Sequence, residues 1–161
     1  MKKRIAVFMC AISLDHQKEI LDGIIAYAKK NRIDVFIFSC YVNYREQEMN
    51  KQGAFKIMEL PDLSQFDGAI IAKNTIRYFD AAERIAKRIV ESGIPAVSID
   101  YPVEGIGKIG TQSYHAQAEI VRHIICEHGV RDVYYIAGPM NEQGRQRYQA
   151  YLDVLKELIL L

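Results

Sequence analysis

The sequence predicts an α/β fold, a doubly wound open sheet of parallel strands with helices on both faces. Two observations lead to this prediction. Four short β-branched runs each end in small or polar residues and precede a helical stretch, at residues 4–9, 34–39, 68–72 and 96–99. Parallel strands need crossover segments of this kind, and sheets covered on both faces bury continuous apolar runs. A fifth run, at residues 133–136, follows a long helical stretch.

The first strand and the first helix follow directly from the pattern. Residues 5–9 are a short apolar run typical of a buried strand. Residues 16–30 have apolar residues at helical spacing, on one face: Ile20, Leu21, Ile24, Ile25 and Ala28. We expect Asp15 to cap the N-terminus of this helix and the basic segment Lys29-Lys30-Asn31 to form its C-terminus.

The middle of the chain holds the second and third strands. Residues 35–38 are a β-branched and aromatic run, and residues 69–72 are a second apolar run after Asp67-Gly68. The pattern between these strands is less regular. A helical turn is expected at residues 45–50, and residues 55–60 alternate as in an edge strand.

A helix and the fourth strand come next. Apolar residues repeat at helical spacing over residues 81–90, and Ser92-Gly93 ends this helix. Residues 96–99 are the fourth strand, which Pro102 prevents from extending. A short extended piece at residues 108–111 then leads toward the next helix.

The last third of the chain is expected to form a helix, a strand and a further helix. Residues 114–128 form the first of these helices, and Gly129 closes it. Residues 133–136 are the expected fifth strand. Asn141 is expected to cap the final helix, which runs through Leu155.

The composition narrows the classes of function. The chain has 161 residues, half of them hydrophobic, with 21 Lys and Arg against 20 Asp and Glu. A balanced charge gives no basic surface for nucleic acid or for an anionic membrane, and no apolar run approaches a membrane span. Three cysteines without metal or redox spacing fit a reducing cytoplasm. We find no catalytic motif, so we expect no enzyme, no metal and no cofactor.

One motif invites a nucleotide-binding interpretation. Residues 105–110 read Gly-Ile-Gly-Lys-Ile-Gly, which satisfies the G-x-G-x-x-G pattern. That pattern binds a pyrophosphate only where it follows a strand and opens a helix. Here residues 100–104 separate it from the strand and residues 108–111 look extended. We therefore favour the interpretation of residues 105–110 as a linker. A small enzyme that binds a nucleotide at this segment is the less favoured alternative.

Candidate site residues cluster where strands end, because ligands of open α/β sheets lie beyond the carboxyl ends of the strands. Asp100 ends a buried strand, where an unpaired carboxylate is costly, so it should meet a donor, a cation or a ligand hydroxyl. Cys10 and Cys40 also follow strands, with His16 nearby, and small buried hydrophobic roles are favoured for both thiols. Arg145 and Arg147 are either solvated or aimed at a ligand.

Five weak motifs in the right order resemble the periplasmic-binding-protein-like (type I) effector domain of LacI-family regulators. They are an opening strand, a Gly-Ile pair in the first helix, an Asp-Gly strand entry, a Gly-Ile-Pro strand ending in Asp, and a Gly-Pro pair followed by Arg. In this chain they lie at residues 3–8, 21–24, 66–71, 93–100 and 136–151.

This resemblance implies a two-lobed domain that closes on a small ligand such as a sugar or a nucleobase. Residues 1–112 would be the N-terminal, Rossmann-like lobe, and residues 113–161 the crossover helix and the start of a second, truncated lobe. Carried over by position, the ligand contacts would be Ser13, Asp15, His16, Tyr41, Asn43, Asn74, Asp100, Tyr101, Gln112 and Arg147. The family's Asn-Pro-Phe after the first strand and its Asp-Asn after the crossover strand are absent, so the ligand is expected to differ from that of a typical sugar repressor.

The piece at residues 55–60 resembles a variant found as the N-terminal sensor of bacterial signalling proteins that often carry a diguanylate cyclase (GGDEF) module. The leading hypothesis is therefore a non-enzymatic, cytoplasmic sensor domain, a homodimer with a downstream output module, without direct contact to nucleic acid or membrane. The alternative is the effector domain of a LacI-type regulator without its DNA-binding headpiece.

Overall fold

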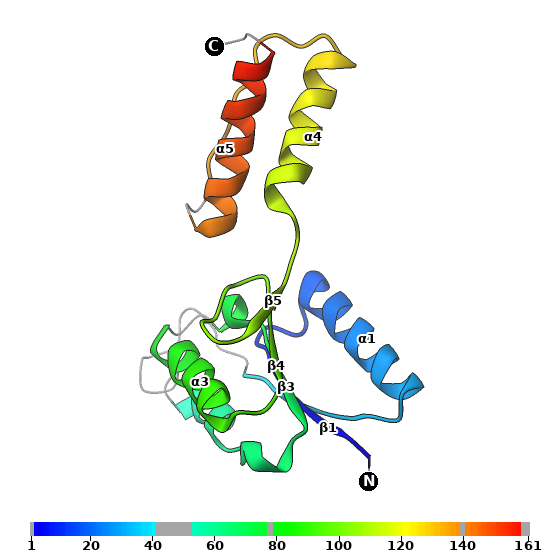
Figure 1. Ribbon diagram of the computed structural model, residues 1–161, viewed down its shortest axis with the longest axis vertical. Helices are drawn as coiled ribbons and strands as arrows, with labels where there is room; N and C mark the ends of the chain where they lie inside the picture. Colours follow the sequence, from blue (N-terminus) through cyan, green and yellow to red (C-terminus); the bar gives the residue numbers. More distant parts are fainter. Residues whose placement is uncertain (1, 41–52, 77–78, 139–140, 159–161) are drawn as a thin grey trace. The chain divides into compact units, whose positions relative to one another are not determined.

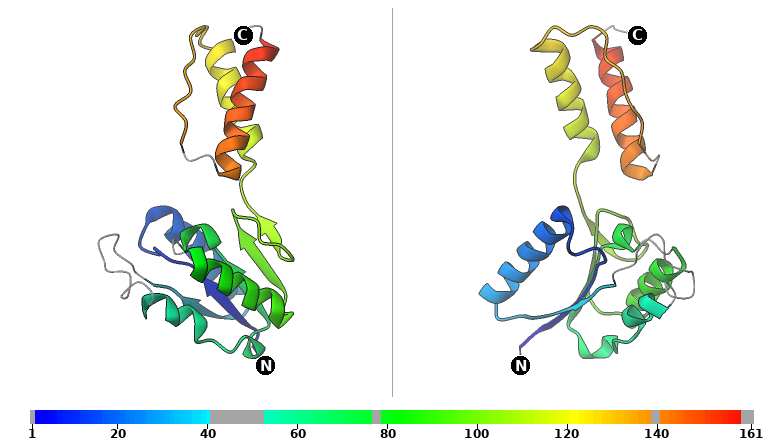
Figure 2. Two further views of the ribbon diagram at one scale, coloured as in Figure 1. Left: turned by 90° about the vertical axis from the view of Figure 1, so that its left-hand side faces the viewer. Right: turned by 180° about the vertical axis from the view of Figure 1, so that it is seen from behind.

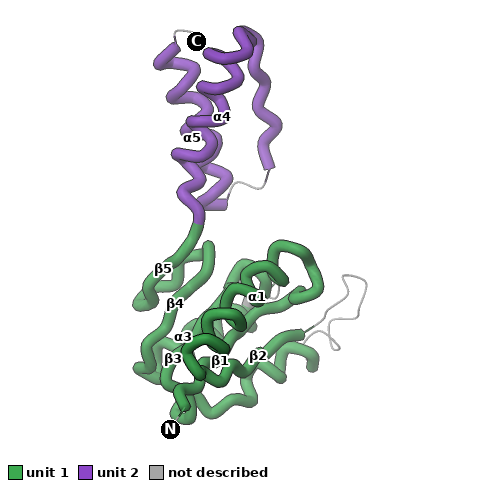
Figure 3. Tube along the Cα trace, turned by 90° about the vertical axis from the view of Figure 1, so that its right-hand side faces the viewer, with its two compact units in different colours: residues 1–110 green, residues 111–161 purple. Residues whose placement is uncertain are grey.

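The computed structural model describes residues 2–40, 53–76, 79–138 and 141–158. Two compact units make up the chain, residues 1–110 and residues 111–161 (Figure 3). Each unit has its own hydrophobic core, and each is described by itself below. The predicted boundary between the two lobes falls after residue 112, and the identity of the units as lobes of a larger domain stays a prediction.

Unit 1 is built on a five-stranded parallel sheet. Its strands are β1 (Arg4–Phe8), β2 (Asp34–Phe38), β3 (Gly68–Ile71), β4 (Ala96–Ile99) and β5 (Gly107–Ile109). The strand order is β2-β1-β3-β4-β5, and every neighbouring pair is parallel. The chain first moves outward from β1 to β2 and then restarts on the other side of β1. This reversal is the switch point of a doubly wound sheet, so the predicted fold class is confirmed.

Helices lie on both faces of this sheet, with α1 (Asp15–Lys30) on one and α3 (Phe79–Ser92) on the other (Figures 1 and 2). Alternate residues of β1 explain why both faces are apolar. Ala6 and Phe8 join the core on the α3 side, and Val7 and Met9 join the core that includes Ile20 and Ile24 of α1. Successive side chains of a strand point to opposite faces, so a strand buried on both faces is apolar throughout.

Unit 2 is a pair of packed helices, α4 (Ser113–Cys126) and α5 (Glu142–Glu157). Three buried residues of each helix form its core, namely Ala118, Val121, Ile125, Ala150, Val154 and Leu155. The Tyr114 hydroxyl donates to Asp153 Oδ2 at 2.8 Å. Asn141 caps α5 as predicted, because its Oδ1 accepts the backbone N–H of Gly144 at 2.8 Å.

The predicted strand at residues 133–136 is wrong. In the described part of unit 2 this segment is extended without strand pairing, and Tyr134 and Ile136 are 89% and 95% exposed. The fifth strand of the sheet is β5 instead, within the piece predicted only as a short extended link. Left-handed backbone at Asp100 and Gly105 lets the chain turn back beside β4, where β5 finds hydrogen-bonding partners. A strand exists only where a neighbour completes its ladder, which periodicity alone does not reveal.

Two local predictions are also wrong. The piece at residues 55–60 is not an edge strand, because Lys56–Glu59 forms the 3₁₀ helix η1. Met58 of η1 is buried, and so is Phe55 at the cap position before it, three positions earlier, as one face of a helical turn requires. Asp15 does not cap α1, since the helix begins at Asp15 and Leu14 occupies the cap position. The turn expected at residues 45–50 lies outside the described residues.

Candidate functional site

The carboxyl ends of β1 and β3 are joined by a buried threonine. Thr75 lies in η3 (Lys73–Thr75), the 3₁₀ turn that follows β3, and is 7% exposed. Its Oγ1 accepts the backbone N–H of Cys10 at 2.9 Å and donates to the carbonyl of Ala72 at 2.7 Å. Two segments 65 residues apart are thereby fixed together at the switch point of the sheet. We call the residues around it, 10–16, 73–75 and 98–101, the rim.

Asp100 is held at the rim by its backbone and by a close glycine. Its φ is +62°, and its backbone N–H donates to the carbonyl of Ile109 at 2.7 Å. A Cβ atom at Gly110 would lie 3.2 Å from both Cα and Oδ1 of Asp100. A side chain at Gly110, directly after β5, would therefore require Asp100 to shift by a few tenths of an ångström.

The Asp100 carboxylate faces the loop that follows β1. Its Oδ2 lies 3.7 Å from Nε2 of His16, in the first turn of α1. The Asp100 side chain is 14% exposed and the imidazole 64% exposed. The carboxylate is thus half-buried, and as an acceptor it can bind a hydroxyl or an amine.

A lysine and a tyrosine complete the rim. Nζ of Lys73 lies 2.6 Å from Oε1 of Glu83 on α3, and the Lys73 side chain is only 13% exposed. The same Nζ lies 5.8 Å from the centroid of the Tyr101 ring, within the range of a cation–π contact. The hydroxyl of Ser98, which is fully buried, donates to the carbonyl of Tyr101 and fixes the turn after β4.

The rim combines charged groups with an aromatic ring. A carboxylate, an imidazole, an ammonium group and a phenol ring line one edge of the sheet, the mixture of donors, acceptors and an aromatic face that polar small molecules use. Among the described residues, no group of three or more His, Cys, Asp or Glu side chains could hold a metal ion.

The structure brings some of the predicted site residues together and leaves others apart. His16, Asp100 and Tyr101 lie at the rim, where Ser13, Asp15 and Asn74 are exposed. Tyr41 and Asn43 lie outside the described residues. Gln112 and Arg147 are exposed residues of unit 2, and their roles as ligand contacts remain predictions.

Sequence reasoning missed Thr75, Glu83 and the special role of Gly110. Thr75 has no motif around it, and its importance comes from a contact with a residue 65 positions away. Glu83 lies on the exposed side of a predicted helix, where an acidic residue is ordinary. Only Gly110 could have been recognised from the sequence, because a glycine within an extended piece is typical of a close approach between two backbone segments.

The G-x-G-x-x-G segment is not built as a phosphate loop. Its central residues form β5, Gly107–Ile109, and pair with β4. A phosphate loop would follow a strand and open a helix, whereas this segment contains the strand. The nucleotide-binding interpretation is therefore not supported, and the linker interpretation is wrong as well, because the segment contributes a strand to the sheet.

Cys10 and Cys40 are buried in the core on the α3 side, as predicted, with 6% of each residue exposed. Their Sγ atoms lie 3.0 Å apart. The hydrogen bond with Cys40 lowers the pKa of the Cys10 thiol, although burial opposes this. The hydrogen bond with Cys10, followed by burial, raises the pKa of Cys40.

Two histidines of unit 2, His123 and His128, lie close together. Five-residue spacing on a helix would splay His123 and His128, but their Nε2 atoms lie 3.0 Å apart. The reason is that α4 ends at Cys126, and Gly129 with φ +64° turns the chain back. Both side chains are exposed.

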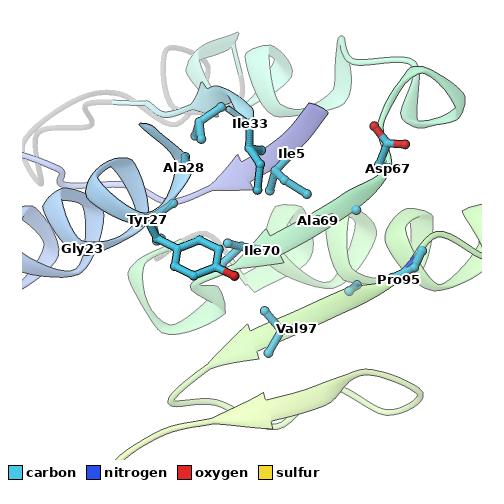
Figure 4. Close-up of a pocket in the computed structure, with 14 residues that line it drawn as sticks. Ile5, Gly23, Tyr27, Ala28, Ile33, Asp67, Ala69, Ile70, Pro95 and Val97 are labelled. Carbon is cyan, nitrogen blue, oxygen red and sulfur yellow. The ribbon is translucent and has the colours of Figure 1, made fainter. Parts of the chain in front are cut away.

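A separate apolar cavity of about 580 Å³ lies against the face of the sheet that α1 covers (Figure 4). It is lined by α1 and by the amino-terminal parts of the strands, and its lining includes Ile5, Tyr27, Asp67, Pro95 and Val97. None of the predicted ligand contacts lines it. It is therefore distinct from the rim.

No protein-family model and no curated protein sequence matches the chain. In the part of the chain that the structure describes, no helix has the length and apolarity needed to cross a membrane.

Solved structures with the same fold include the arabinose-binding protein AraP from Geobacillus stearothermophilus (17% identity, TM-score 0.73). They also include the lac repressor dimer bound to operator and the anti-inducer ONPF (15%, 0.70), and the LacI-family regulator CCPA from Weissella paramesenteroides with bound sucrose (13%, 0.67). The matches cover 98%, 100% and 99% of this chain, but 52%, 53% and 55% of those chains. The chain thus spans about half the length of the proteins it matches. It has the α/β fold of the lobes of type I periplasmic binding proteins and LacI-type regulators.

Proposed function

We propose that this chain is a non-enzymatic, small-molecule-sensing domain of a bacterial signalling or regulatory protein. The observation that supports this most is the rim, where Asp100, His16, Lys73 and Tyr101 gather at the switch point of a parallel sheet. Ligands of open α/β sheets bind at this position. The ligand class that fits is a small polyhydroxylated or hydrogen-bonding molecule, such as a sugar or a nucleobase.

The solved structures with this fold support the same class of ligand. Their names and descriptions mention arabinose, D-xylulofuranose, β-D-glucose and sucrose. A carboxylate suits sugars because one carboxylate accepts hydrogen bonds from two neighbouring hydroxyls, and an aromatic ring covers an apolar sugar face. The ligand proposed here is defined by that chemistry and not by any one of these compounds.

The setting of the domain is part of the proposal. We expect a cytoplasmic homodimer that passes ligand occupancy to a downstream output module, such as a diguanylate cyclase. The second candidate, favoured by the match to the lac repressor and to CCPA, is the effector domain of a transcription regulator. The DNA on either side of this reading frame distinguishes them, since a helix-turn-helix upstream supports the regulator and a GGDEF module downstream supports the signalling protein.

A thermal-shift screen of the whole chain tests ligand binding. Monosaccharides, nucleobases, nucleosides and amino acids are each added at millimolar concentration. A ligand that binds only the folded state raises the Tm, by an amount that grows with ligand concentration. The rise should vanish in Asp100→Asn and persist in Asp67→Asn, a matched control at the opposite end of the sheet, where the carboxylate accepts the Arg4 N–H at 2.7 Å. A flat response over the panel contradicts the sensing role, and a rise that Asp67→Asn abolishes instead moves the site to the apolar cavity.

A further inference from the structure

Two cysteines far apart in the sequence meet at the ends of neighbouring strands. β1 and β2 pair in parallel with a constant offset of 30 residues, from Arg4 opposite Asp34 to Phe8 opposite Phe38. Cys10 and Cys40 keep this offset two residues beyond the paired segment, and their Sγ atoms lie 3.0 Å apart. Neighbouring parallel strands lie about 4.8 Å apart, within the Cα separation that a disulfide spans.

The pair differs from ordinary buried cysteines in having a second thiol as its hydrogen-bonding partner. The backbone N–H of Cys10 is already taken by Thr75 Oγ1, which holds the end of β1 in place. Their hydrogen bond lowers the pKa of Cys10 and raises the pKa of Cys40, so Cys10 is the thiol of the pair that ionises first. The thiolate is the form of cysteine that an oxidant attacks, and a neighbouring thiol can then form a disulfide with the oxidised sulfur.

We propose that Cys10 and Cys40 are an oxidation site, at which a hydroperoxide converts the two thiols into a reversible disulfide. The Cys10 thiolate attacks one peroxide oxygen, the O–O bond breaks, and Cys10 becomes a sulfenic acid while hydrogen peroxide releases hydroxide. The Cys40 sulfur then attacks the Cys10 sulfur, the S–O bond breaks, and the oxygen leaves as water. In sum, two thiols lose two electrons and two protons, and one peroxide is reduced to two waters.

The expected product requires little movement. A disulfide bond is about 2.05 Å long, so the sulfur atoms approach by about 1 Å. The bond would join the chain leaving β1 directly to the chain leaving β2, next to the segment that carries His16. The site is independent of the proposed ligand, because it depends on the two thiols alone.

Peptide mapping of the whole, reduced chain is the test. The folded protein is treated with one equivalent of hydrogen peroxide, denatured in N-ethylmaleimide to label free thiols, and digested with trypsin. Residues 5–18 and 33–45 should appear as one linked species, two hydrogens lighter than the sum of the two peptides. Cys126, the exposed cysteine of unit 2, should be recovered labelled. Dithiothreitol before labelling should remove the linked species, and oxidation should raise the Tm by on the order of 10 °C, as expected for a bond that closes a loop of this length.

Two variants make the result specific. Cys126→Ser should form the linked species as the wild type does, which excludes exchange through the third cysteine. Cys40→Ser should form none and should instead let dimedone trap a sulfenic acid at Cys10. The inference is overturned if Cys10 and Cys40 are both recovered labelled while Cys126 is oxidised, or if the link forms only in denatured protein. The wild-type map decides this even if Cys40→Ser does not fold.

Discussion

The backbone at Asp100 allows the charge and the conformation of the rim to be tested separately. Its φ of +62° lies in the left-handed region, which Asn and Asp tolerate because their short polar side chains hydrogen-bond locally. Alanine in this region costs roughly 1–2 kcal/mol. The pair with His16 adds little to stability, since the atoms are 3.7 Å apart and the imidazole is 64% exposed. An ion pair of this kind contributes below about 1 kcal/mol.

Two substitutions at this position should therefore differ. Asp100→Asn removes the charge and keeps the conformation, and it should lower the free energy of unfolding by less than about 1 kcal/mol. Asp100→Ala loses the charge and adopts a strained backbone, and it should cost roughly 1–3 kcal/mol. Equilibrium urea unfolding followed by circular dichroism measures both. Equal losses for the two variants would refute the strained conformation on which this description of the rim depends.

Gly110 offers a companion test of the same packing. A Cβ at this position would lie 3.2 Å from Cα and Oδ1 of Asp100. Gly110→Ala should therefore cost about 1 kcal/mol or more, because backbone atoms must move. Gly107→Ala, in β5 three residues before Gly110, meets nothing within 4 Å and should leave stability unchanged or slightly higher. A larger loss at Gly107 than at Gly110 would contradict the close approach.

Two further predictions concern unit 2. Asn141→Ala removes the side-chain cap of α5 and should lower the free energy of unfolding by about 1 kcal/mol. Gln112 occupies the cap position of α4 without a side-chain hydrogen bond, so Gln112→Ala should not change the free energy of unfolding. Equal effects of the two variants in urea unfolding would contradict the cap. The pKa of Asp153 is lowered, chiefly by the hydrogen bond from the Tyr114 hydroxyl, so its contribution to stability is present above its ordinary pKa of 3.8 and is lost as the pH falls through its lower value in the folded state. Acid titration followed by circular dichroism should show this loss, and Tyr114→Phe should make it smaller.

Most of the fold follows from local pattern. In the described part of the chain, the first four strands and the four long helices are encoded by apolar runs and helical spacing, since both depend on residues within one segment. β5 could not be predicted this way, because its three residues are exposed and carry no apolar pattern. It depends on the left-handed turns at Asp100 and Gly105, which return the chain to β4. The prediction of a strand at residues 133–136 failed for the opposite reason, since this segment has the composition of a strand but pairs with no other strand among the described residues.

The candidate site was predictable in part. The topology of parallel sheets predicts that ligand-binding residues lie at the carboxyl ends of the strands. Asp100 could be chosen among them because it ends a buried strand. Its approach to His16 and the contact between Lys73 and Tyr101 depend on how loops from different strands pack. The meeting of Cys10 with Cys40 depends on the register of β1 and β2, which spacing along the chain does not give.

The most direct test of the central claim is to locate the bound ligand by amide chemical shifts. The ¹⁵N-labelled chain is titrated with the compound that raises its Tm most in the screen. The proposal predicts saturable shifts concentrated at the rim, around His16, Lys73 and Asp100, with the same titration in Asp100→Asn giving none. Shifts concentrated instead around Ile5 and Val97, which line the apolar cavity, or no shift at millimolar ligand, would contradict a small-molecule sensor that binds at the strand ends.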